Sequence, residues 1–230
     1  MALRENLAEV RKKIADAALA AGRNPKDILL IAVSKTKPVS MIEEVVDAGV
    51  LDFGENRPQE LAEKFSQVPG VRFHQIGQLQ RNKVKYIIDK ACLIHSVDSL
   101  ALACEIEKRA AMIDKVQDIL VQVNISGEES KSGVTPKDAL ALCEEISKLS
   151  HVRIQGLMTI SVAGAGAEED YQIFSELKAL AEEIEKKEIP GVSMKELSMG
   201  MTNDYETAIR AGATMVRVGS GIFGVRDYSK

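Results

Sequence analysis

Lys35 is the residue whose position most directly suggests covalent chemistry. It follows an unbroken apolar run, residues 28–33, with the length and composition of a strand buried on both faces, and Pro38 soon blocks any continuation of that strand. In a parallel α/β barrel, a side chain at the carboxyl end of a strand points into the active-site mouth. An amine held there against an apolar wall can lose its proton and attack a carbonyl to form a Schiff base. The simpler alternative is that Lys35 ends the strand and extends to solvent.

Two glycine-bearing turns near the end of the sequence suggest a phosphate site. Ser198-Met199-Gly200-Met201 follows the seventh expected strand, and Gly219-Ser220-Gly221 follows the eighth. Barrels frequently bind phosphate with the loops at these two places. Glycines let backbone N–H groups approach an anion, and serine hydroxyls can donate further hydrogen bonds. Together the two turns predict a phosphate cup.

Arg217 is the third residue that suggests a ligand. In Met215-Val216-Arg217-Val218 the two valines share one strand face, which suits packing under helices, so Arg217 is expected inside the barrel. A charge in that position needs an ionic partner or an acceptor on a ligand. One alternative is a buried structural ion pair, for instance with Glu55.

An amine, a phosphate cup and an inward arginine together fit pyridoxal 5′-phosphate. The aldehyde would bond to Lys35, the phosphate would lie between the two turns, and Arg217 would donate to the ring nitrogen. Because an arginine does not give up its proton, it would keep the pyridine nitrogen unprotonated. The ring would then be a weaker electron sink than one paired with a carboxylate.

The elements that would position these residues alternate between strand and helix along the whole chain. Residues 3–22 have the apolar spacing of an amphipathic helix that precedes the first strand. Strands are expected at 28–34, 51–53, 71–76, 92–95, 118–125, 152–158, 196–198 and 215–218, with a helical segment after each of the first seven, including one from about 79 to 89. Ser40, Asp98 and Thr135 are expected to cap helices, the last with Pro136 at the first helical position. This pattern predicts a single-domain (βα)8 barrel over residues 1–230; an open doubly wound sheet usually has fewer strands and a Gly-rich first turn.

Composition narrows the class of protein further. A net charge of −4 argues against a general nucleic-acid binder, and no apolar run approaches the length of a membrane span. The three cysteines form no C-x-x-C pair and are expected to be reduced thiols. The beginning of the sequence lacks a signal-type apolar core, so we expect a cytoplasmic protein. We also expect a monomer, because the helix pattern leaves no long apolar seam uncovered.

Several short blocks, spread over nearly the whole chain, resemble those of the pyridoxal phosphate homeostasis proteins. The blocks lie at 32–38, 53–56, 76–80, 123–125, 130–133, 156–158, 197–201 and 217–220. These proteins are similar to the N-terminal barrel of alanine racemase, so the resemblance implies a fold-type III barrel with the cofactor on Lys35. It further implies that Asn56 lies beside the ring, that Ser198, Gly219 and Ser220 bind phosphate, and that Arg217 meets the ring nitrogen. Family members are taken to buffer the cofactor and deliver it, with apo enzymes as possible recipients, and have no established catalytic turnover.

The sequence departs from the family pattern at Arg57-Pro58, where an aromatic and a small residue are expected, and at Phe73, Gln78 and Ser220. Serine at 220 keeps the hydroxyl of the more frequent threonine, so the phosphate cup is retained.

Two enzymatic alternatives remain. An amino-acid racemase needs a second acid/base opposite the lysine. By family resemblance, a tyrosine from an additional β domain of the partner subunit supplies it in alanine racemases. We expect no such domain after the eighth strand, and Tyr86, Tyr171, Tyr205 and Tyr228 are expected in helices or the tail, so a carrier is favoured. A Schiff-base aldolase acting on a sugar phosphate would use the same lysine and phosphate cup, but it predicts no bound chromophore.

Overall fold

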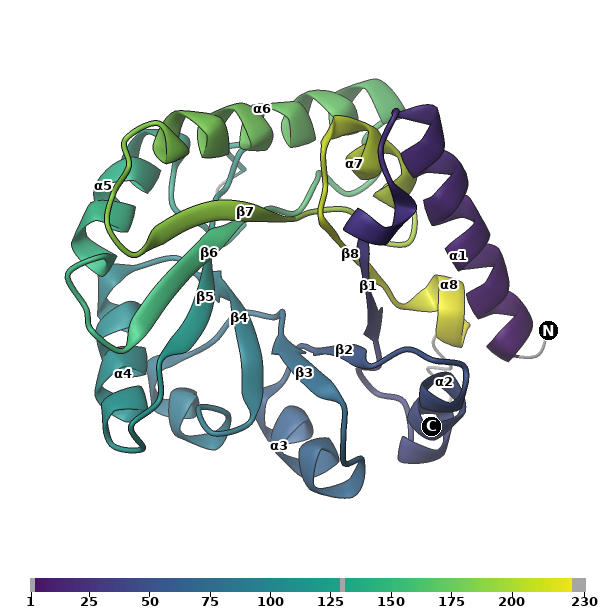
Figure 1. Cartoon of the computed structure of the whole chain (residues 1–230), viewed down its shortest axis with the longest axis horizontal. Coiled ribbons are helices and arrows are strands. Elements are labelled where there is room, and N and C mark those ends of the chain that lie inside the picture. The colour runs from purple at the N-terminus through teal and green to yellow at the C-terminus, as the bar shows by residue number, and fades with distance from the viewer. Residues whose placement is uncertain (1–2, 129–130, 225–230) are drawn as a thin grey trace.

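Eight parallel strands close into a barrel, with each strand paired to its neighbours in chain order and β8 paired back to β1. The computed structural model describes residues 3–128 and 131–224; Ser130 and Tyr228 of the sequence analysis lie outside these ranges. The strands are β1 (Leu29–Val33), β2 (Asp52–Glu55), β3 (Arg72–Gln75), β4 (Ala91–Val97), β5 (Gln117–Gln122), β6 (Val152–Met158), β7 (Val192–Ser198) and β8 (Met215–Val218). The expected (βα)8 barrel with an additional first helix is therefore confirmed (Figure 1).

The helices form a ring outside the strands (Figure 1). They are α1 (Leu3–Ala20), α2 (Val39–Asp47), α3 (Pro58–Gln67), α4 (Leu100–Ala111), α5 (Pro136–Ile146), α6 (Ala167–Glu185), α7 (Tyr205–Ala211) and α8 (Ser220–Phe223), with 3₁₀ turns at Pro25–Asp27 and Arg81–Tyr86. The additional helix α1 packs against α7 and α8 through Leu7, Val10 and Ile14, whose spacing places them on one helix face. Within the described ranges, no helix combines the length and apolar character needed to span a bilayer.

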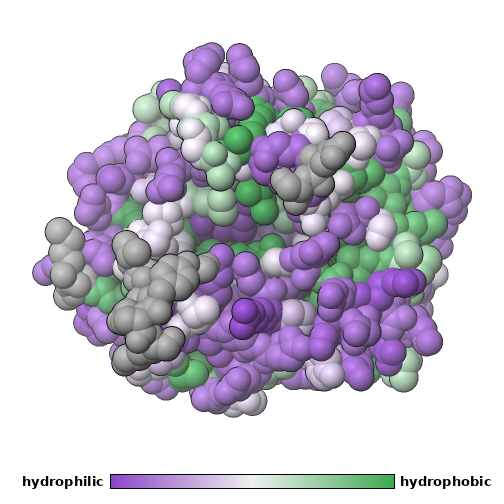
Figure 2. Space-filling view, turned by 180° about the vertical axis from the view of Figure 1, so that it is seen from behind, coloured by the Kyte–Doolittle hydropathy of each residue, from purple (hydrophilic) through white to green (hydrophobic). Residues whose placement is uncertain are grey.

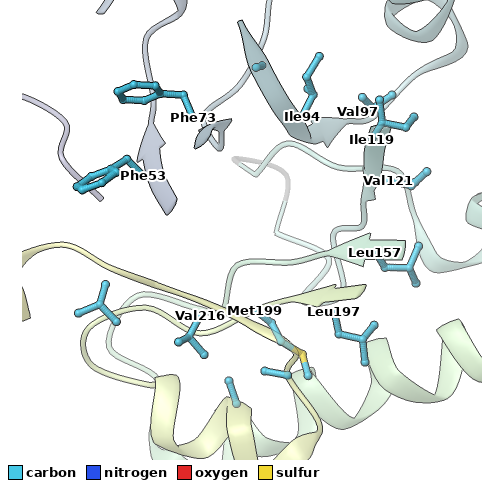
Figure 3. Packing of buried hydrophobic residues seen from close by; sticks show 14 of the residues in the cluster. Phe53, Phe73, Ile94, Val97, Ile119, Val121, Leu157, Leu197, Met199 and Val216 are labelled. Atoms are coloured by element: carbon cyan, nitrogen blue, oxygen red, sulfur yellow. The ribbon is translucent and has the colours of Figure 1, made fainter. Parts of the chain in front are cut away.

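Strand alternation divides the apolar side chains between two cores. Phe53, Phe73 and Val216 are among the outward-facing side chains that pack under the helices (Figure 3). A smaller cluster fills the barrel interior and comprises Ile31, Leu93, Leu120, Met158 and Met215. Residues two positions away from a member of either core share its face, which decides where the polar strand residues point.

Local predictions differ from the structure at several helix ends and at one strand. The segment expected as a helix from 79 to 89 forms only the short 3₁₀ turn Arg81–Tyr86. The seventh strand is longer than expected, because Val192 and Met194 extend it before the charged Lys195 and Glu196. Thr135 and Pro136 begin α5 as expected, although the Thr135 side chain makes no capping hydrogen bond.

Two of the expected N-caps are wrong. Helix α2 begins at Val39 after Pro38, so Ser40 lies inside the first turn, where its backbone is already helical and cannot cap. Helix α4 has Ser99, not Asp98, at its N-cap.

Candidate functional site

The carboxyl ends of the strands surround a cavity of about 860 Å³. Five of the six site residues expected from the sequence lie in its wall: Lys35, Asn56, Arg217, Gly219 and Ser220. The face seen in Figure 2 is hollowed near its centre, where hydrophilic and hydrophobic side chains meet. Residues far apart in the chain therefore share one cavity, as the barrel topology requires.

Ser198 is the expected site residue that does not line the cavity. It is fully buried, and its hydroxyl lies 2.5 Å from Nη1 of Arg217 and 2.8 Å from Nδ1 of His95. As the last residue of β7 it shares the inward face with Glu196, but it is not part of the cavity wall, whereas its partner Arg217 is. Strand alternation alone does not reveal this difference.

Lys35 leaves the end of β1 on the inward face, together with Val33, and is half-buried in the cavity wall. The next residue, Thr36, has φ +64°. The left-handed region is costly for a β-branched residue and persists only where neighbouring groups enforce it. The Thr36 N–H donates to Oε1 of Glu60, at 2.6 Å, and this bond helps to hold the chain in that conformation.

A set of three charges on α3 and β2, which we call the α3 clamp (Glu55, Glu60 and Lys64), lies on the outer side of the same segment; Glu55 and Lys64 are buried and Glu60 is half-buried. Nζ of Lys64 donates to Oε1 of Glu55 at 2.8 Å and to Oε1 of Glu60 at 2.6 Å. It also donates to the carbonyl of Ser34, at 2.7 Å. The clamp thus holds the backbone immediately before and after Lys35.

Glu55 is fully buried, and burial raises its pKa, while the nearby Lys64 ammonium acts in the opposite direction. Its Oε1 accepts from the Ser34 hydroxyl at 2.6 Å, whereas its Oε2 has no hydrogen-bond partner among the described residues. Because Glu55 shares the outward face of β2 with Phe53, it cannot reach Arg217, and the ion pair considered as an alternative does not form.

Arg217 points into the barrel next to Met215, as the alternation of β8 predicts. It is 3% exposed, and its Nη2 donates to the carbonyl of Thr159 at 2.9 Å. Burial lowers the pKa of Arg217 to about 10, with the Asp204 carboxylate opposing this effect, so the guanidinium stays charged at neutral pH. The bonds to Thr159 and Ser198 use two of its five N–H donors, which leaves donors for a ligand in the cavity.

Thr202 is a cavity residue that the sequence reasoning missed. Its Oγ1 accepts from the backbone N–H of Gly219 at 3.3 Å and of Gly221 at 3.4 Å. A side chain at position 221 would place its Cβ 3.2 Å from Cγ2 of Thr202 and 3.0 Å from Cγ1 of Val218. Thr202 follows directly after the expected 198–201 turn, which was the only indication in the sequence that it belongs to the site. That this turn meets the 219–221 turn is visible only in the fold.

Four further charged residues and part of one loop also line the cavity. Lys37 and Lys131 are basic, Asp170 and Asp204 are acidic, and Ala163–Ala165 belongs to the Gly/Ala loop before α6. Nζ of Lys37 donates to the carbonyl of Phe223, at 3.0 Å. Burial raises the pKa of Asp204. Within the described ranges, no group of three or more His, Cys, Asp or Glu side chains is arranged to hold a metal ion.

Comparison with known proteins agrees with this geometry. The family model for the N-terminal domain of alanine racemase matches residues 1–227. A pyridoxal phosphate homeostasis protein from Aquifex aeolicus is 41% identical over 226 residues, which cover 97% of this chain and 98% of that protein. The chain belongs to the pyridoxal phosphate homeostasis protein family. The Escherichia coli K12 member of this family is 40% identical over 231 residues, covering 98% of this chain and 97% of its own.

Solved structures extend the comparison. PipY from Synechococcus elongatus PCC7942, solved with PLP bound, is 34% identical, with a TM-score of 0.85. The match covers 97% of this chain and 100% of PipY. An alanine racemase from Clostridium difficile 630 has a TM-score of 0.77 at 17% identity, and the match covers 97% of this chain but 56% of the racemase. The racemase shares the barrel fold, whereas the homeostasis proteins also share sequence along nearly the full chain.

Proposed function

We propose that this member of the pyridoxal phosphate homeostasis protein family binds pyridoxal 5′-phosphate through a Schiff base on Lys35, stores it and delivers it to apo enzymes. The observation that carries the proposal is that Lys35, Arg217 and the Gly219–Ser220 turn line the same cavity. The relative PipY, solved with PLP bound, supports the choice of ligand.

The residues of the cavity fit this cofactor on chemical grounds. Two backbone N–H groups, of Gly219 and Gly221, already converge on one oxygen, Oγ1 of Thr202, so the turn is arranged to donate to an oxygen ligand. We infer that these groups and the Ser220 hydroxyl hold the phosphate, and that Asn56 lies beside the ring. Ser198 would not contact the phosphate, because it bonds to Arg217 and does not line the cavity.

Arg217 would orient the cofactor and limit its chemistry. A guanidinium that stays protonated donates to the pyridine nitrogen and leaves that nitrogen without a proton. The bound cofactor supplies an aldehyde for a reversible covalent bond, and its ring would withdraw electrons only weakly in this setting. Such a site favours storage over turnover of amino acids, in agreement with the names of the relatives.

The covalent site is tested by reducing the holo-protein with borohydride and mapping the modified peptide by mass spectrometry. We expect the label on Lys35. Because Lys37 and Lys131 also line the cavity, mapping is more decisive than loss of a visible band in a Lys35→Ala variant. Lys137→Ala, on α5, is the matched control and should be labelled like wild type. A label found mainly on another lysine of wild type would refute the assignment.

Delivery is tested by mixing holo-protein with an apo PLP-dependent enzyme and following recovery of its activity, with a scavenger of free PLP present. Transfer that the scavenger does not prevent supports direct delivery; transfer that it abolishes supports storage alone. Racemisation of alanine faster than with free PLP would favour the racemase alternative instead. The expected monomer is checked by sedimentation of the holo-protein.

A further inference from the structure

A buried chain of polar side chains crosses the interior of the barrel and ends at Arg217. Oδ1 of Asp52 lies 3.0 Å from Nε2 of His74, and Nδ1 of His74 lies 3.0 Å from Nε2 of His95. Nδ1 of His95 lies 2.8 Å from Oγ of Ser198, which accepts from Nη1 of Arg217 at 2.5 Å. The five residues come from β2, β3, β4, β7 and β8, so the chain links strands on different sides of the barrel.

The chain is anchored at the end remote from the cavity. Arg72 holds the Asp52 carboxylate with two hydrogen bonds, from Nε at 2.7 Å and from Nη2 at 2.5 Å. Bidentate geometry of this kind fixes both the position and the ionised state of a carboxylate. Asp52 therefore presents a fixed acceptor to His74.

The two histidines differ in charge. Burial opposes a charge on His74, but the hydrogen bond to Asp52 and the Cys92 sulfur outweigh it and raise its pKa to about 9. Burial, together with the positive charges of His74 and Arg217, holds the pKa of His95 well below its usual range. His74 is then an imidazolium and His95 a neutral ring.

These charges determine the direction of each hydrogen bond. The imidazolium of His74 donates from both nitrogens, to Asp52 and to Nε2 of His95, so the proton of His95 must be on Nδ1. That N–H donates to Oγ of Ser198, which also accepts from Arg217 and so has both lone pairs occupied. Ser198 therefore links the His95 ring to Nη1 of Arg217.

We propose that His95 and Ser198 are positioning residues that hold the Arg217 guanidinium in place for its ligand, and that the proton shared between His74 and His95 sets the direction of the hydrogen bonds they make. The identity of the ligand rests on the proposed function. The hydrogen bonds that link the five side chains do not depend on a ligand. Of the five residues, only Arg217 lines the cavity.

Four ionisable groups act on the histidine pair, either directly or through Arg217. Asp52 and Cys92 lie against His74, Arg217 lies beyond His95, and Asp204 acts on Arg217 from the cavity side. No carboxylate other than Asp52 pairs with either of these two histidines among the described residues. Protonation of the pair is therefore coupled to Arg217 through Ser198.

Two substitutions at position 95 separate positioning from simple filling of the core. An asparagine amide occupies the place of Nδ1 and keeps a donor for Ser198, while a glutamine amide occupies the place of Nε2 and keeps the contact with His74. We expect His95→Gln to weaken PLP binding up to about tenfold, as for loss of the neutral hydrogen bond from His95 to Ser198, and His95→Asn to weaken it less than about threefold. His151→Asn, at the half-buried pair with Glu107, is the control and should bind like wild type.

NMR spectra of the protein without PLP and with PLP give a second test. Proton NMR of the apo wild type should show downfield imidazole N–H signals that are retained in His151→Asn and altered in both His95 variants. With ¹⁵N-labelled PLP, the pyridine nitrogen shift should change in His95→Gln and in Ser198→Ala but not in the control.

Equal weakening by the glutamine and asparagine variants, with an unchanged pyridine shift, would overturn the proposal and leave a structural role only. Failure of wild type to bind PLP would reject the proposed function, while the apo spectra would still decide whether the chain exists. Absence of downfield signals in the apo wild type would refute the hydrogen bonds between His74, His95 and Ser198.

Discussion

Removal of the Lys64 ammonium by Lys64→Met tests whether the α3 clamp aims Lys35. Lys64 is 5% exposed and donates to three acceptors, of which Oε1 of Glu55 and the carbonyl of Ser34 are buried. Loss of one partner of a buried ion pair leaves the other charge uncompensated and costs about 3–5 kcal/mol. Since a domain of this kind is stabilised by roughly 5–15 kcal/mol in total, the variant should fold but unfold at much lower urea concentration.

The pH dependence of Lys64→Met distinguishes this mechanism from a general packing defect. Without the ammonium, the pKa of Glu55 should rise further above its unfolded value, because burial already raises it in wild type. A carboxyl with a raised folded pKa contributes stability below its unfolded pKa, and this is lost as pH rises through the folded pKa. The gap in stability between variant and wild type, measured by urea unfolding with circular dichroism, should therefore widen as pH rises above the wild-type pKa of Glu55, which itself lies above the ordinary value for a glutamate.

The same variant should bind the aldehyde poorly. Once Ser34 and Glu60 are released, Thr36 can leave φ +64°, and Lys35 changes direction. We expect the rate of Schiff-base formation with added PLP, followed by absorbance, to fall at least about tenfold. Lys12→Met is the matched control, since Lys12 pairs with Asp16 on the exposed face of α1, and its loss should leave the urea midpoint and the rate close to those of wild type. A Lys64→Met protein with wild-type stability and wild-type rate would refute the clamp.

Three other predictions follow from single features. In the folded protein His74 is protonated up to about pH 9 and His95 is neutral. Below about pH 6.5 the two histidines therefore bind one proton more in the unfolded protein than in the folded protein, and between about 6.5 and 9 they bind one fewer, so their contribution to the free energy of unfolding should peak near pH 6.5. The urea midpoint of wild type and of His95→Asn, measured across this pH range, tests the peak. Thr36→Gly should raise stability by about 0.5 kcal/mol without weakening PLP binding, because relief of the left-handed strain exceeds the added chain entropy, and paired urea and binding titrations check this. Gly156→Ala should abolish or severely reduce folding, by more than about 4 kcal/mol, since a Cβ there would lie 1.8 Å from the carbonyl oxygen of Glu196 on β7; circular dichroism of the purified variant tests it.

Each of these has a clear contrary result. A wild-type urea midpoint that His95→Asn leaves unchanged at every pH would contradict the charge states given to the pair. A less stable Thr36→Gly protein would show that the left-handed turn is not strained. A well-folded Gly156→Ala protein would mean that β6 and β7 can separate without loss of the barrel.

Strand periodicity predicted the parts of the site that depend on one strand alone. Lys35 follows a buried apolar run, and Arg217 alternates with two valines, so the end of β1 and the inward face of β8 were readable from the sequence. The same alternation, applied to Phe53 and Glu55, also shows why Glu55 faces outward and cannot meet Arg217.

Contacts between distant segments were not readable in this way. Lys64 has the sequence context of an exposed helix position and becomes buried only because α3 covers the end of β1. His74 and His95 fit the pattern of ordinary core residues, and their pairing depends on the register between β3 and β4, which shifts near Phe73 and His74. Thr202 and the 219–221 turn meet because two loops converge, and no local propensity encodes that approach.

The close contact between Gly77 and Asn56 ties together the loops after β2 and β3, and Nε2 of Gln75 donates to the carbonyl oxygens of both residues at 3.0 Å. A Cβ at position 77 would lie 2.5 Å from the carbonyl oxygen of Asn56 and 2.7 Å from its Cα. Because both residues line the cavity, a larger residue at position 77 would move Asn56 and change the cavity wall. Relatives with a side chain at this site should therefore carry a rebuilt turn after β2, and a designer who wishes to reshape the entrance should alter both loops together.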